Sequence, residues 1–375
     1  MKHLLIDALS VRNLSGRHVL LGHVHELLSA LSGEWKFSLL THRDNAEIVG
    51  QVPDSVAHLL AEASEHWISR TRWGWRQFDR LARDQQVDLV FSPSGMLSPG
   101  CSMPQLVLAQ NPWPMLAKER GVQALRLGLQ REGFRRAQRR AWRMAFNSEY
   151  MRQLYSESFG PPAHPPIVAY QGISPALLES AEHDHDQRAR APQVLAVSVM
   201  ARHKAIDVLV DAFSLLLREH SAARLILIGA WPEPEYRQEI EQQIRRLDLQ
   251  PRVELLGHVD LAILHAHYRS ARAFCLLSRC ESFGIPAVEA QAAGTPTVVA
   301  AGTAAPEITG RGGLVVPQDD PRAAAEALSF LLDDNAKWTD YSRAARSNAE
   351  RYRWAACSAP LVDSLREFAA QGRGQ

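Results

Sequence analysis

Short apolar runs alternate with longer helical segments along most of the chain. In the first half, each run ends in small or polar residues and leads into a stretch typical of a helix or a turn. The runs predicted to be strands lie at residues 3–9, 36–41, 87–91, 105–109, 140–146 and 166–170. Parallel strands joined by crossover helices produce this alternation. The pattern therefore predicts an α/β fold with a doubly wound parallel sheet.

A polar, charged stretch interrupts this pattern, and a second series of strands and helices begins at Val194. A length of 375 residues favours two domains of ordinary size. We expect an N-terminal domain at residues 1–175, a linker at 176–193 and a C-terminal domain at 194–352.

Composition narrows the functional classes. A formal net charge of +1 does not suit a nucleic-acid-binding surface, so nucleic acid is not an expected partner. The four cysteines show no paired framework and are expected to be buried free thiols of a cytoplasmic protein. The first apolar run is broken by Asp7 and is expected to be a strand and not a signal peptide. No apolar stretch is long enough for a transmembrane helix.

The segment at residues 278–299 carries the strongest chemical signal. Its sequence predicts a strand end, a loop, a helix, a tight turn and another strand, with Glu281 in the loop and Glu289 in the helix. Open α/β sheets bind ligands in the crevice at the carboxyl ends of their strands. The helix N-terminus favours a phosphate or diphosphate, and the carboxylates can accept hydrogen bonds from sugar hydroxyls. The combination predicts a ligand with both phosphate and sugar parts.

The same segment resembles a known family. The spacing Glu281-x7-Glu289, followed by Ala-x-x-x-Gly-Thr-Pro, resembles the retaining glycosyltransferases of family 4, also called glycosyl transferases group 1. The likeness extends in order to residues 194–207, 225–229, 253–258, 306–307 and 312–317. It covers residues 190–355 closely, whereas the first half matches only in outline.

The resemblance implies a GT-B fold, in which two Rossmann-like domains face a central cleft and a C-terminal helix, here 353–375, returns to the N-terminal domain. It implies transfer of a hexosyl group from a UDP- or GDP-linked donor to a hydroxyl of a glycan, a lipid-linked acceptor or a small molecule. Anomeric configuration would be retained by front-face transfer, without a named general base. The resemblance also implies no cofactor and metal-independent activity.

Residue roles carry over position by position. Lys204 and Glu281 match the residues at the diphosphate and near the donor sugar, and Glu289 matches the glutamate that holds ribose hydroxyls. The other expected donor-binding positions are Gly284, Phe283, Ser282, Ile285, Arg202, Gly16 and Gly229. The family usually has a glycine and an arginine where this chain has Val197-Ser-Val199, and Arg202 or His203 is the expected substitute for the arginine.

Asn111 and Trp113 lie at the end of an N-domain strand, where many family members have a histidine near the donor sugar. Asn111 is a candidate for hydrogen bonds to donor or acceptor hydroxyls, and Trp113 is a candidate for stacking on a sugar. The alternative is an ordinary turn, because Asn-Pro and Trp-Pro are strong turn signals.

Two further segments have competing interpretations. Asp184-His-Asp186 has the form of a metal-binding motif, but it lies in the linker and is expected to be solvated. The strongly basic stretch 126–143 carries a thin apolar stripe, Phe134, Ala137, Ala141 and Ala145. It could lie peripherally on an anionic membrane at the inner face, or it could be a solvated or acceptor-binding basic face.

Two alternative functions remain open from the sequence. A non-catalytic GT-B scaffold with a decayed nucleotide-sugar site would account for the missing arginine and the glycine-poor loop around Gly16. A sugar-nucleotide epimerase shares the architecture, although the carboxylates and histidines that its chemistry needs are not recognisable here.

Overall fold

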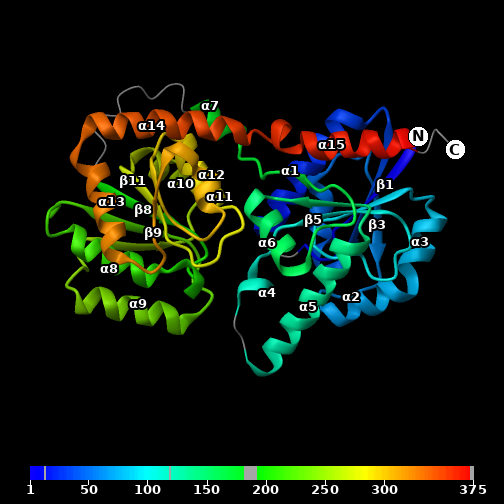
Figure 1. The fold of residues 1–375 in the computed structure, drawn as a ribbon, viewed down its shortest axis with the longest axis horizontal. Coiled ribbons are helices and arrows are strands. Elements are labelled where there is room, and N and C mark those ends of the chain that lie inside the picture. Colours follow the sequence, from blue (N-terminus) through cyan, green and yellow to red (C-terminus); the bar gives the residue numbers. More distant parts are fainter. Residues whose placement is uncertain (12–13, 118–119, 181–191, 372–375) are drawn as a thin grey trace. The chain divides into compact units, whose positions relative to one another are not determined.

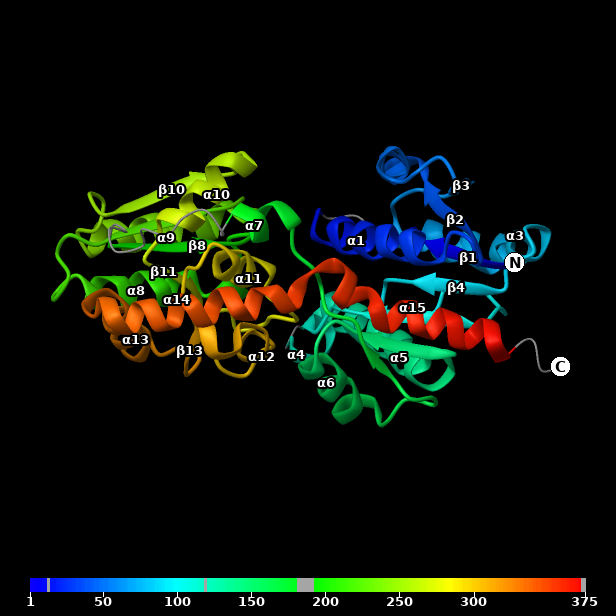
Figure 2. The ribbon, with the colours of Figure 1, turned by 90° about the horizontal axis from the view of Figure 1, so that it is seen from above.

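The computed structural model describes residues 1–11, 14–117, 120–180 and 192–371. The chain forms two compact units, which Figures 1 and 2 show in two views. Unit 1 comprises Met1–Gly172 together with Trp354–Gln375, and unit 2 comprises Ile173–Arg353. Helix α7 (Pro175–Ser180) and strand β8 (Gln193–Val197) occupy the two ends of the predicted linker, and residues 181–191 lie outside the described residues.

Unit 1 is built on a parallel sheet of seven strands in the order β3-β2-β1-β4-β5-β6-β7. The strands are β1 (Lys2–Asp7), β2 (Trp35–His42), β3 (Ala57–Ala61), β4 (Leu89–Ser92), β5 (Gln105–Ala109), β6 (Arg143–Phe146) and β7 (Ile167–Val168). Six of them correspond to the predicted strands. β3 was not predicted; it is a short edge strand with mostly exposed side chains, and His58 interrupts its apolar residues.

The helices of unit 1 differ from the prediction at one site position. They are α1 (Leu14–Leu31), α2 (Trp67–Trp73), α3 (Asp79–Asp84), α4 (Trp113–Leu116), α5 (Gly121–Arg140), α6 (Glu149–Phe159) and α15 (Trp354–Gln371). A 3-10 segment at Arg43–Gln51 and a π-helical turn at Gly74–Phe78 complete the unit. The predicted loop at residues 13–17 is wrong from Leu14 onward, because α1 begins there and Gly16 lies in its first turn.

Helix α15 is anchored to unit 1 by a tryptophan. Trp354 packs so closely on two glycines that an added Cβ would lie 2.3 Å from its ring at Gly22 and 2.4 Å at Gly172. Beside it, the buried His23 shares a 2.9 Å hydrogen bond with Ser358, and Arg143 forms an ion pair with Glu367 at 2.8 Å. The C-terminal helix therefore belongs to the same compact unit as α1.

Unit 2 is built on a parallel sheet of six strands in the order β10-β9-β8-β11-β12-β13. Besides β8, the strands are β9 (Arg224–Ile228), β10 (Val253–Gly257), β11 (Ala273–Leu276), β12 (Thr297–Ala300) and β13 (Gly313–Val316). Numbered within the unit, this is the order 3-2-1-4-5-6 of a doubly wound nucleotide-binding sheet. The fold class predicted from the sequence, two Rossmann-like parallel-sheet domains, is confirmed.

The strands of unit 2 are apolar on both faces because helices cover both. Alternate strand residues, such as Val194 and Leu195, enter two separate core clusters. One cluster includes residues of α8 (Ile206–Leu216), α9 (Pro234–Arg246), α13 (Pro321–Asp333) and α14 (Asn335–Ala349). The other includes residues of α10 (Leu261–Ser270), α11 (Ile285–Ala292) and α12 (Ala305–Thr309). Helices α8 and α11 therefore pack on opposite faces of the sheet.

Candidate functional site

The predicted donor residues lie at the topological switch point of unit 2. Strand β8 pairs with β9 on one side and with β11 on the other. The chain leaves β8 toward α8 on one face, and it leaves β11 toward α11 on the opposite face. The two loops therefore diverge, and doubly wound sheets bind ligands in the crevice that such a divergence opens.

Lys204 and Glu281 meet at this switch point. Lys204 closes a short 3-10 turn after β8, and Glu281 lies in the loop between β11 and α11. The Nζ atom of Lys204 lies 2.5 Å from Oε2 of Glu281, although the residues are 77 positions apart. Their side chains are 15% and 14% exposed, so the ion pair is held in the protein surface and still reached by solvent. The two predicted catalytic residues are therefore brought together.

Arg279 fastens these two loops to each other. Its backbone N–H donates to the carbonyl oxygen of His203 at 2.7 Å. Its guanidinium donates to the carbonyl oxygen of Arg202 at 2.8 Å, to Asp207 at 2.8 Å and to Asp319 at 2.6 Å. Burial opposes ionisation of Asp207, but the hydrogen bond and charge of Arg279 prevail and lower the pKa of that carboxyl. The clamp is therefore ionic near neutral pH.

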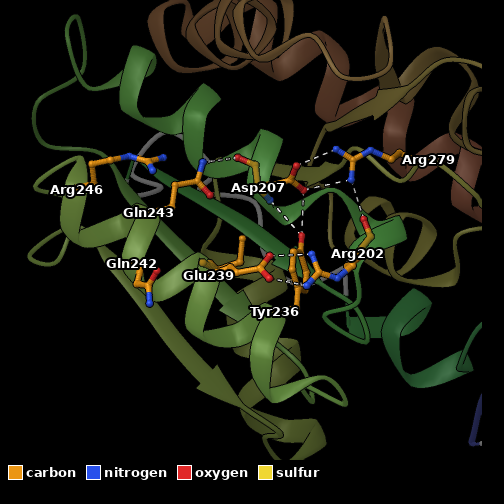
Figure 3. Close-up of a pocket in the computed structure, with 9 residues that line it drawn as sticks. Arg202, Asp207, Tyr236, Glu239, Gln242, Gln243, Arg246 and Arg279 are labelled. Atoms are coloured by element: carbon orange, nitrogen blue, oxygen red, sulfur yellow. Dashed lines mark hydrogen bonds and ion pairs between the residues drawn. The ribbon is translucent and has the colours of Figure 1, made fainter.

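Arg202 is turned toward α9 and not toward Lys204. Its guanidinium bonds both carboxylate oxygens of Glu239, at 2.7 and 2.6 Å, and it lies 4.9 Å from the ring centre of Tyr236. It also pairs with Glu233 at 3.3 Å. Figure 3 shows the contacts of Arg202 with Glu239 and Tyr236. The structure thus does not bring Arg202 together with the pair of Lys204 and Glu281, and its predicted phosphate contact stays a prediction.

A pocket of about 390 Å³ lies beside the clamp, on its α9 side (Figure 3). The residues that line it are Arg202, Asp207, Tyr236, Glu239, Ile240, Gln242, Gln243, Arg246 and Arg279. Arg202 and Arg279 are paired with carboxylates of the same pocket. Arg202 is a predicted donor residue, but Lys204, Glu281 and Glu289 are not among the lining residues, so this pocket does not coincide with the Lys204–Glu281 pair.

Glu289 lies in α11, eight residues after Glu281 in the sequence, and it is partly buried. The hydroxyl of Tyr268, in α10, donates a 2.8 Å hydrogen bond to its Oε2 atom. Burial raises the pKa of the Glu289 carboxyl, and the bond from Tyr268 opposes this rise. A carboxylate fixed by one donor can still accept from vicinal hydroxyls through its other oxygen.

The start of α11 needs its glycine. Gly284 is the N-cap residue with a φ of +99°, a backbone conformation that residues with a Cβ rarely adopt. Pro286 follows in the first turn, where the missing N–H costs no helical hydrogen bond. Ser282 and Ile285 flank this cap and are partly exposed. The cap thus places the positive end of α11 beside Glu281.

Two of the predicted donor residues, Phe283 and Gly229, serve the packing of unit 2. The Phe283 side chain is 1% exposed and makes an edge-to-face contact with Tyr352, with ring centres 5.5 Å apart. A Cβ at Gly229 would lie 1.7 Å from the carbonyl oxygen of Ser198, so this glycine permits the close approach of two backbone segments. Any donor contact at these positions would involve the backbone and not a side chain.

The predicted residues of unit 1 form local structure. The Oδ1 atom of Asn111 accepts a 3.0 Å hydrogen bond from the Trp113 N–H, which is the turn expected as the alternative. Asn111 is exposed, and the Trp113 side chain is 38% exposed. Gly16 lies in the first turn of α1. The structure leaves the ligand roles of these three residues as predictions.

Sequence reasoning missed Tyr268, the partner of Glu289, and Arg279, the clamp between the loops. Arg279 stands two residues before Glu281, so its place in the loop was a usable signal. Tyr268 carried no such signal, because its contact depends on how α10 packs against α11. His203, which the sequence offered as a substitute for the family's arginine, precedes Lys204 directly; burial, then the charge of Lys204, lowers the pKa of its imidazole.

Neither cysteine nor metal chemistry stands out around the pair. Burial, followed by the charge of Glu281, raises the pKa of the Cys280 thiol to about 12, which leaves it protonated and a weak nucleophile. Within the described ranges, no group of three or more His, Cys, Asp or Glu side chains is arranged to hold a metal ion. The predicted decoy Asp184-His-Asp186 lies outside the described residues.

Across the described part of the chain, no helix combines the length and apolar character needed to cross a bilayer. All four cysteines are free; Cys275, Cys280 and Cys357 are buried and Cys101 is partly exposed. The expectation of buried free thiols is thus confirmed for three of the four.

Solved structures share the fold. Sucrose-phosphate synthase from Thermosynechococcus elongatus superposes with a TM-score of 0.73 at 18% identity, covering 99% of this chain and 100% of that one. HepE of Anabaena, in complex with UDP and glucose, gives a TM-score of 0.71 at 18% identity over 98% of this chain and all of its own.

Curated relatives match over part of their length. A D-inositol 3-phosphate glycosyltransferase of Kineococcus radiotolerans is 32% identical over 246 residues, which are 60% of this chain and 57% of that protein. A GDP-mannose-dependent α-(1-6)-phosphatidylinositol monomannoside mannosyltransferase of Mycobacterium tuberculosis is 29% identical over 238 residues, 60% of this chain and 61% of that protein. The matches with the first two relatives thus span 57% and 42% of those relatives' length.

The family model described as glycosyl transferases group 1 matches residues 179–350. This range contains β8, β11, α11 and the three residues Lys204, Glu281 and Glu289. The resemblance drawn from the sequence is therefore confirmed: unit 2 of this chain matches the glycosyl transferases group 1 family model.

Proposed function

We propose that this chain transfers a sugar from a nucleotide diphosphate sugar to an acceptor hydroxyl. The observation that carries the proposal is the Lys204–Glu281 pair at the switch point of unit 2, with Glu289 on the helix that begins beside it. The family-model match of unit 2 and the relatives named as glycosyltransferases support the same activity.

The leaving group determines what the site must do. As the glycosidic bond breaks, negative charge grows on the departing diphosphate, and fixed positive charge lowers the barrier. The ammonium of Lys204 has three N–H donors, so its bond to Glu281 leaves two for phosphate oxygens. The N-terminus of α11 adds backbone N–H groups and a positive dipole on the same side.

The carboxylates divide the remaining tasks. Glu289 is proposed to accept hydrogen bonds from the two ribose hydroxyls, with Tyr268 fixing its rotamer. Glu281 is proposed to face the donor sugar while it holds Lys204 in place. The arrangement grips a ligand at its nucleoside, its diphosphate and its sugar.

Finer features belong to the same proposal. We infer a UDP- or GDP-linked hexosyl donor, retention of anomeric configuration by front-face transfer and activity that requires no metal or cofactor. The anomeric proton coupling of the product would test retention. Activity that is lost with EDTA and restored by Mg²⁺ or Mn²⁺ would contradict the metal-independent part.

The acceptor is proposed to be a hydroxyl of a glycan, a lipid-linked sugar or a small polar molecule. Gly16, Asn111 and Trp113 in unit 1 remain the candidate contacts on this side. We also propose a cytoplasmic location with peripheral contact to an anionic membrane.

Calorimetric titration with UDP, GDP and ADP tests the donor site. One of these should bind the wild-type protein, and at 100 times its Kd it should stabilise the fold by about 2.7 kcal/mol. Lys204→Ala should weaken binding, whereas Lys337→Ala, a lysine 55% exposed elsewhere on unit 2, should not. Failure to bind any of the three would contradict the proposal. If the protein bound a nucleotide but showed neither sugar transfer nor slow hydrolysis of the donor, the decayed scaffold would be favoured.

A further inference from the structure

The first half of α5 presents apolar side chains to solvent. Val122, Leu125 and Leu129 are 84%, 68% and 57% exposed. At about 100° per residue, the three lie within about 60° of one another around the helix. Scattered exposed apolar residues are ordinary, but three large ones in line on a single helix mark a contact surface. We call this set the outer face of α5.

The apolar stripe suggested by the sequence is a different one, and its residues are buried, so this stripe does not contact a membrane. Phe134 and Ala137 are 2% and 0% exposed, and they pack in a core with Tyr155. Ala141 and Ala145 are buried as well. This stripe fastens α5 to unit 1, and it leaves the outer face on another side of the helix.

The outer face carries positive charge. Helix α5 contains six arginines and a single acidic residue, Glu132. Arg126, Arg136 and Arg140 fall within the same third of the helix circumference as the exposed leucines, and all three are exposed. Glu132 pairs with Arg135 and Arg136, so it offsets only part of this charge.

The outer face is also held firmly. Arg131 donates to the carbonyl oxygen of Pro114, which ties α5 to α4. In Figure 1 the first half of α5 projects beyond the neighbouring helices of unit 1. A projecting, anchored helix with leucines and arginines on one side fits a flat surface better than a groove.

We propose that the outer face of α5 docks unit 1 on a bilayer that contains anionic phospholipid. The leucines and valine would enter the interface between headgroups and acyl chains, and the arginines would meet lipid phosphates. A second copy of the chain fits less well, because a symmetric contact through this face would set arginines against arginines. The proposal gives a surface to the peripheral membrane contact proposed above, and it does not depend on the donor site.

Vesicle flotation tests the proposal. Vesicles of phosphatidylcholine alone should leave the wild-type protein behind, whereas vesicles that also contain phosphatidylglycerol should carry it upward. Each arginine near such a surface contributes about 1 kcal/mol, which is about fivefold in partitioning. The double variant Arg126→Gln/Arg140→Gln should therefore bind about 25-fold less. High salt should also weaken the binding of the wild-type protein to anionic vesicles.

The apolar part has its own variant and control. Leu125→Ser/Leu129→Ser should lose at least tenfold in binding, because each leucine gives up apolar burial. Leu60→Ser/Leu261→Ser changes two leucines that are 58% and 71% exposed elsewhere, and it should bind like the wild type. Arg80→Gln/Arg343→Gln, at arginines 78% and 76% exposed, is the matched control for charge.

Three results would overturn the proposal: no flotation with anionic vesicles, equal losses in the control variants, or a concentration-dependent dimer that the leucine variant abolishes. Circular dichroism and melting curves must first show that each variant is folded. Nucleotide titration of the same samples separates this proposal from the donor site. Nucleotide binding without flotation contradicts only the membrane surface, and flotation without nucleotide binding contradicts only the proposed transferase.

Discussion

The two units share the strand order 3-2-1-4-5-6, to which unit 1 adds β7, but the residues at their switch points have different roles. In unit 2 the switch point holds Lys204 and Glu281, a pair that solvent still reaches. In unit 1 the equivalent point, between β1 and β4, holds Asp7, which is 6% exposed. Asp7 accepts hydrogen bonds from the Ser98 hydroxyl and, at 3.0 Å, from the Leu9 N–H. Burial raises the pKa of its carboxyl.

The difference shows that topology fixes the place of a site and loop side chains decide its use. The carboxylate in unit 1 is satisfied by its own unit and serves structure. The charged pair in unit 2 retains unfilled hydrogen-bonding capacity, which a ligand can use. Variants at the two switch points should therefore act on different properties.

The largest contrast should come from Lys204→Ala set against Asp7→Asn. Removing one electrostatic stabiliser of a developing charge typically costs about 10²- to 10³-fold, so Lys204→Ala should lower kcat/KM by about that factor. Asp7→Asn should change kcat/KM by only a few-fold and act mainly on stability. Steady-state transfer with saturating acceptor is the measurement, and melting curves check that both variants fold. Equal losses in the two variants would remove the contrast between the switch points.

Glu289→Gln should give the next largest effect. Hydrogen bonds to a charged group contribute about 1.5–3 kcal/mol each, so the Kd for the nucleoside diphosphate should rise about ten- to hundredfold. Glu350→Gln, a carboxylate 51% exposed in the same unit, is the control. Because burial raises the pKa of Glu289, wild-type affinity should also fall as pH drops through that raised pKa, and the Gln variant should lack this fall. An unchanged Kd would contradict the proposed ribose contact.

Lys204 and Glu289 could be proposed as site residues from the sequence because the signal was local. The apolar runs, the glycine before Pro286 and the spacing of Glu281 and Glu289 all lie within short segments. Parallel sheets place successive strand ends along one edge, so Lys204 could be assigned to the same crevice from its place after β8.

What the sequence did not provide depends on distant partners. The direction of Arg202 is set by Glu239, 37 residues away in α9. The burial of Phe134 and Ala137 is set by the packing of α5 on its sheet, which composition alone did not reveal. The start of α1 at Leu14 was missed because Asn, Ser and Gly, which surround it in the sequence, are typical of loops as well as of helix starts. In each case tertiary contacts override a local pattern that is compatible with more than one structure.

The interior of unit 1 should respond to pH through His23. Burial, and then the charge of His18, lowers the pKa of His23 to about 3 from an ordinary value of 6.5. The unfolded chain therefore takes up a proton below pH 6.5 that the folded chain refuses, and stability falls with pH in this window. Between pH 7.5 and 5 the loss should be about 2 kcal/mol. This contribution of His23 should be absent in His23→Gln.

Urea unfolding of both proteins at the two pH values measures the loss of unfolding free energy in each. Subtracting the loss in the variant from that in the wild type cancels the contribution of the other histidines. Nucleotide binding should keep the same Kd in His23→Gln, because His23 lies under α15 in unit 1. If the wild type and the variant lose stability in parallel, the proton is taken up elsewhere. In that case burial would not hold His23 neutral in unit 1, and the structural role of the ionisable residues there would rest on Asp7.

The smallest effect should come from Arg279, which tests whether the charged pair of unit 2 depends on its scaffold. Arg279 is not itself a predicted ligand residue, but it joins the loop of Lys204 to the loop of Glu281. Arg279→Lys keeps the charge and loses the forked contact with Asp207 and the carbonyl of Arg202. A displaced Lys204 would stabilise the leaving group less, so kcat should fall several-fold while KM for the donor changes little.

A merely structural role would act differently. If Arg279 only stabilised the fold, the melting temperature would fall and kcat per folded molecule would stay unchanged. Asp207→Asn weakens the same clamp from the other side, so the double variant should lose no more kcat than the single Arg279→Lys variant. Losses that multiply in the double variant would mean that the two residues act separately. In that case the ion pair between Lys204 and Glu281 would hold its position without the clamp. The difference between the two switch points would then rest on these two side chains alone.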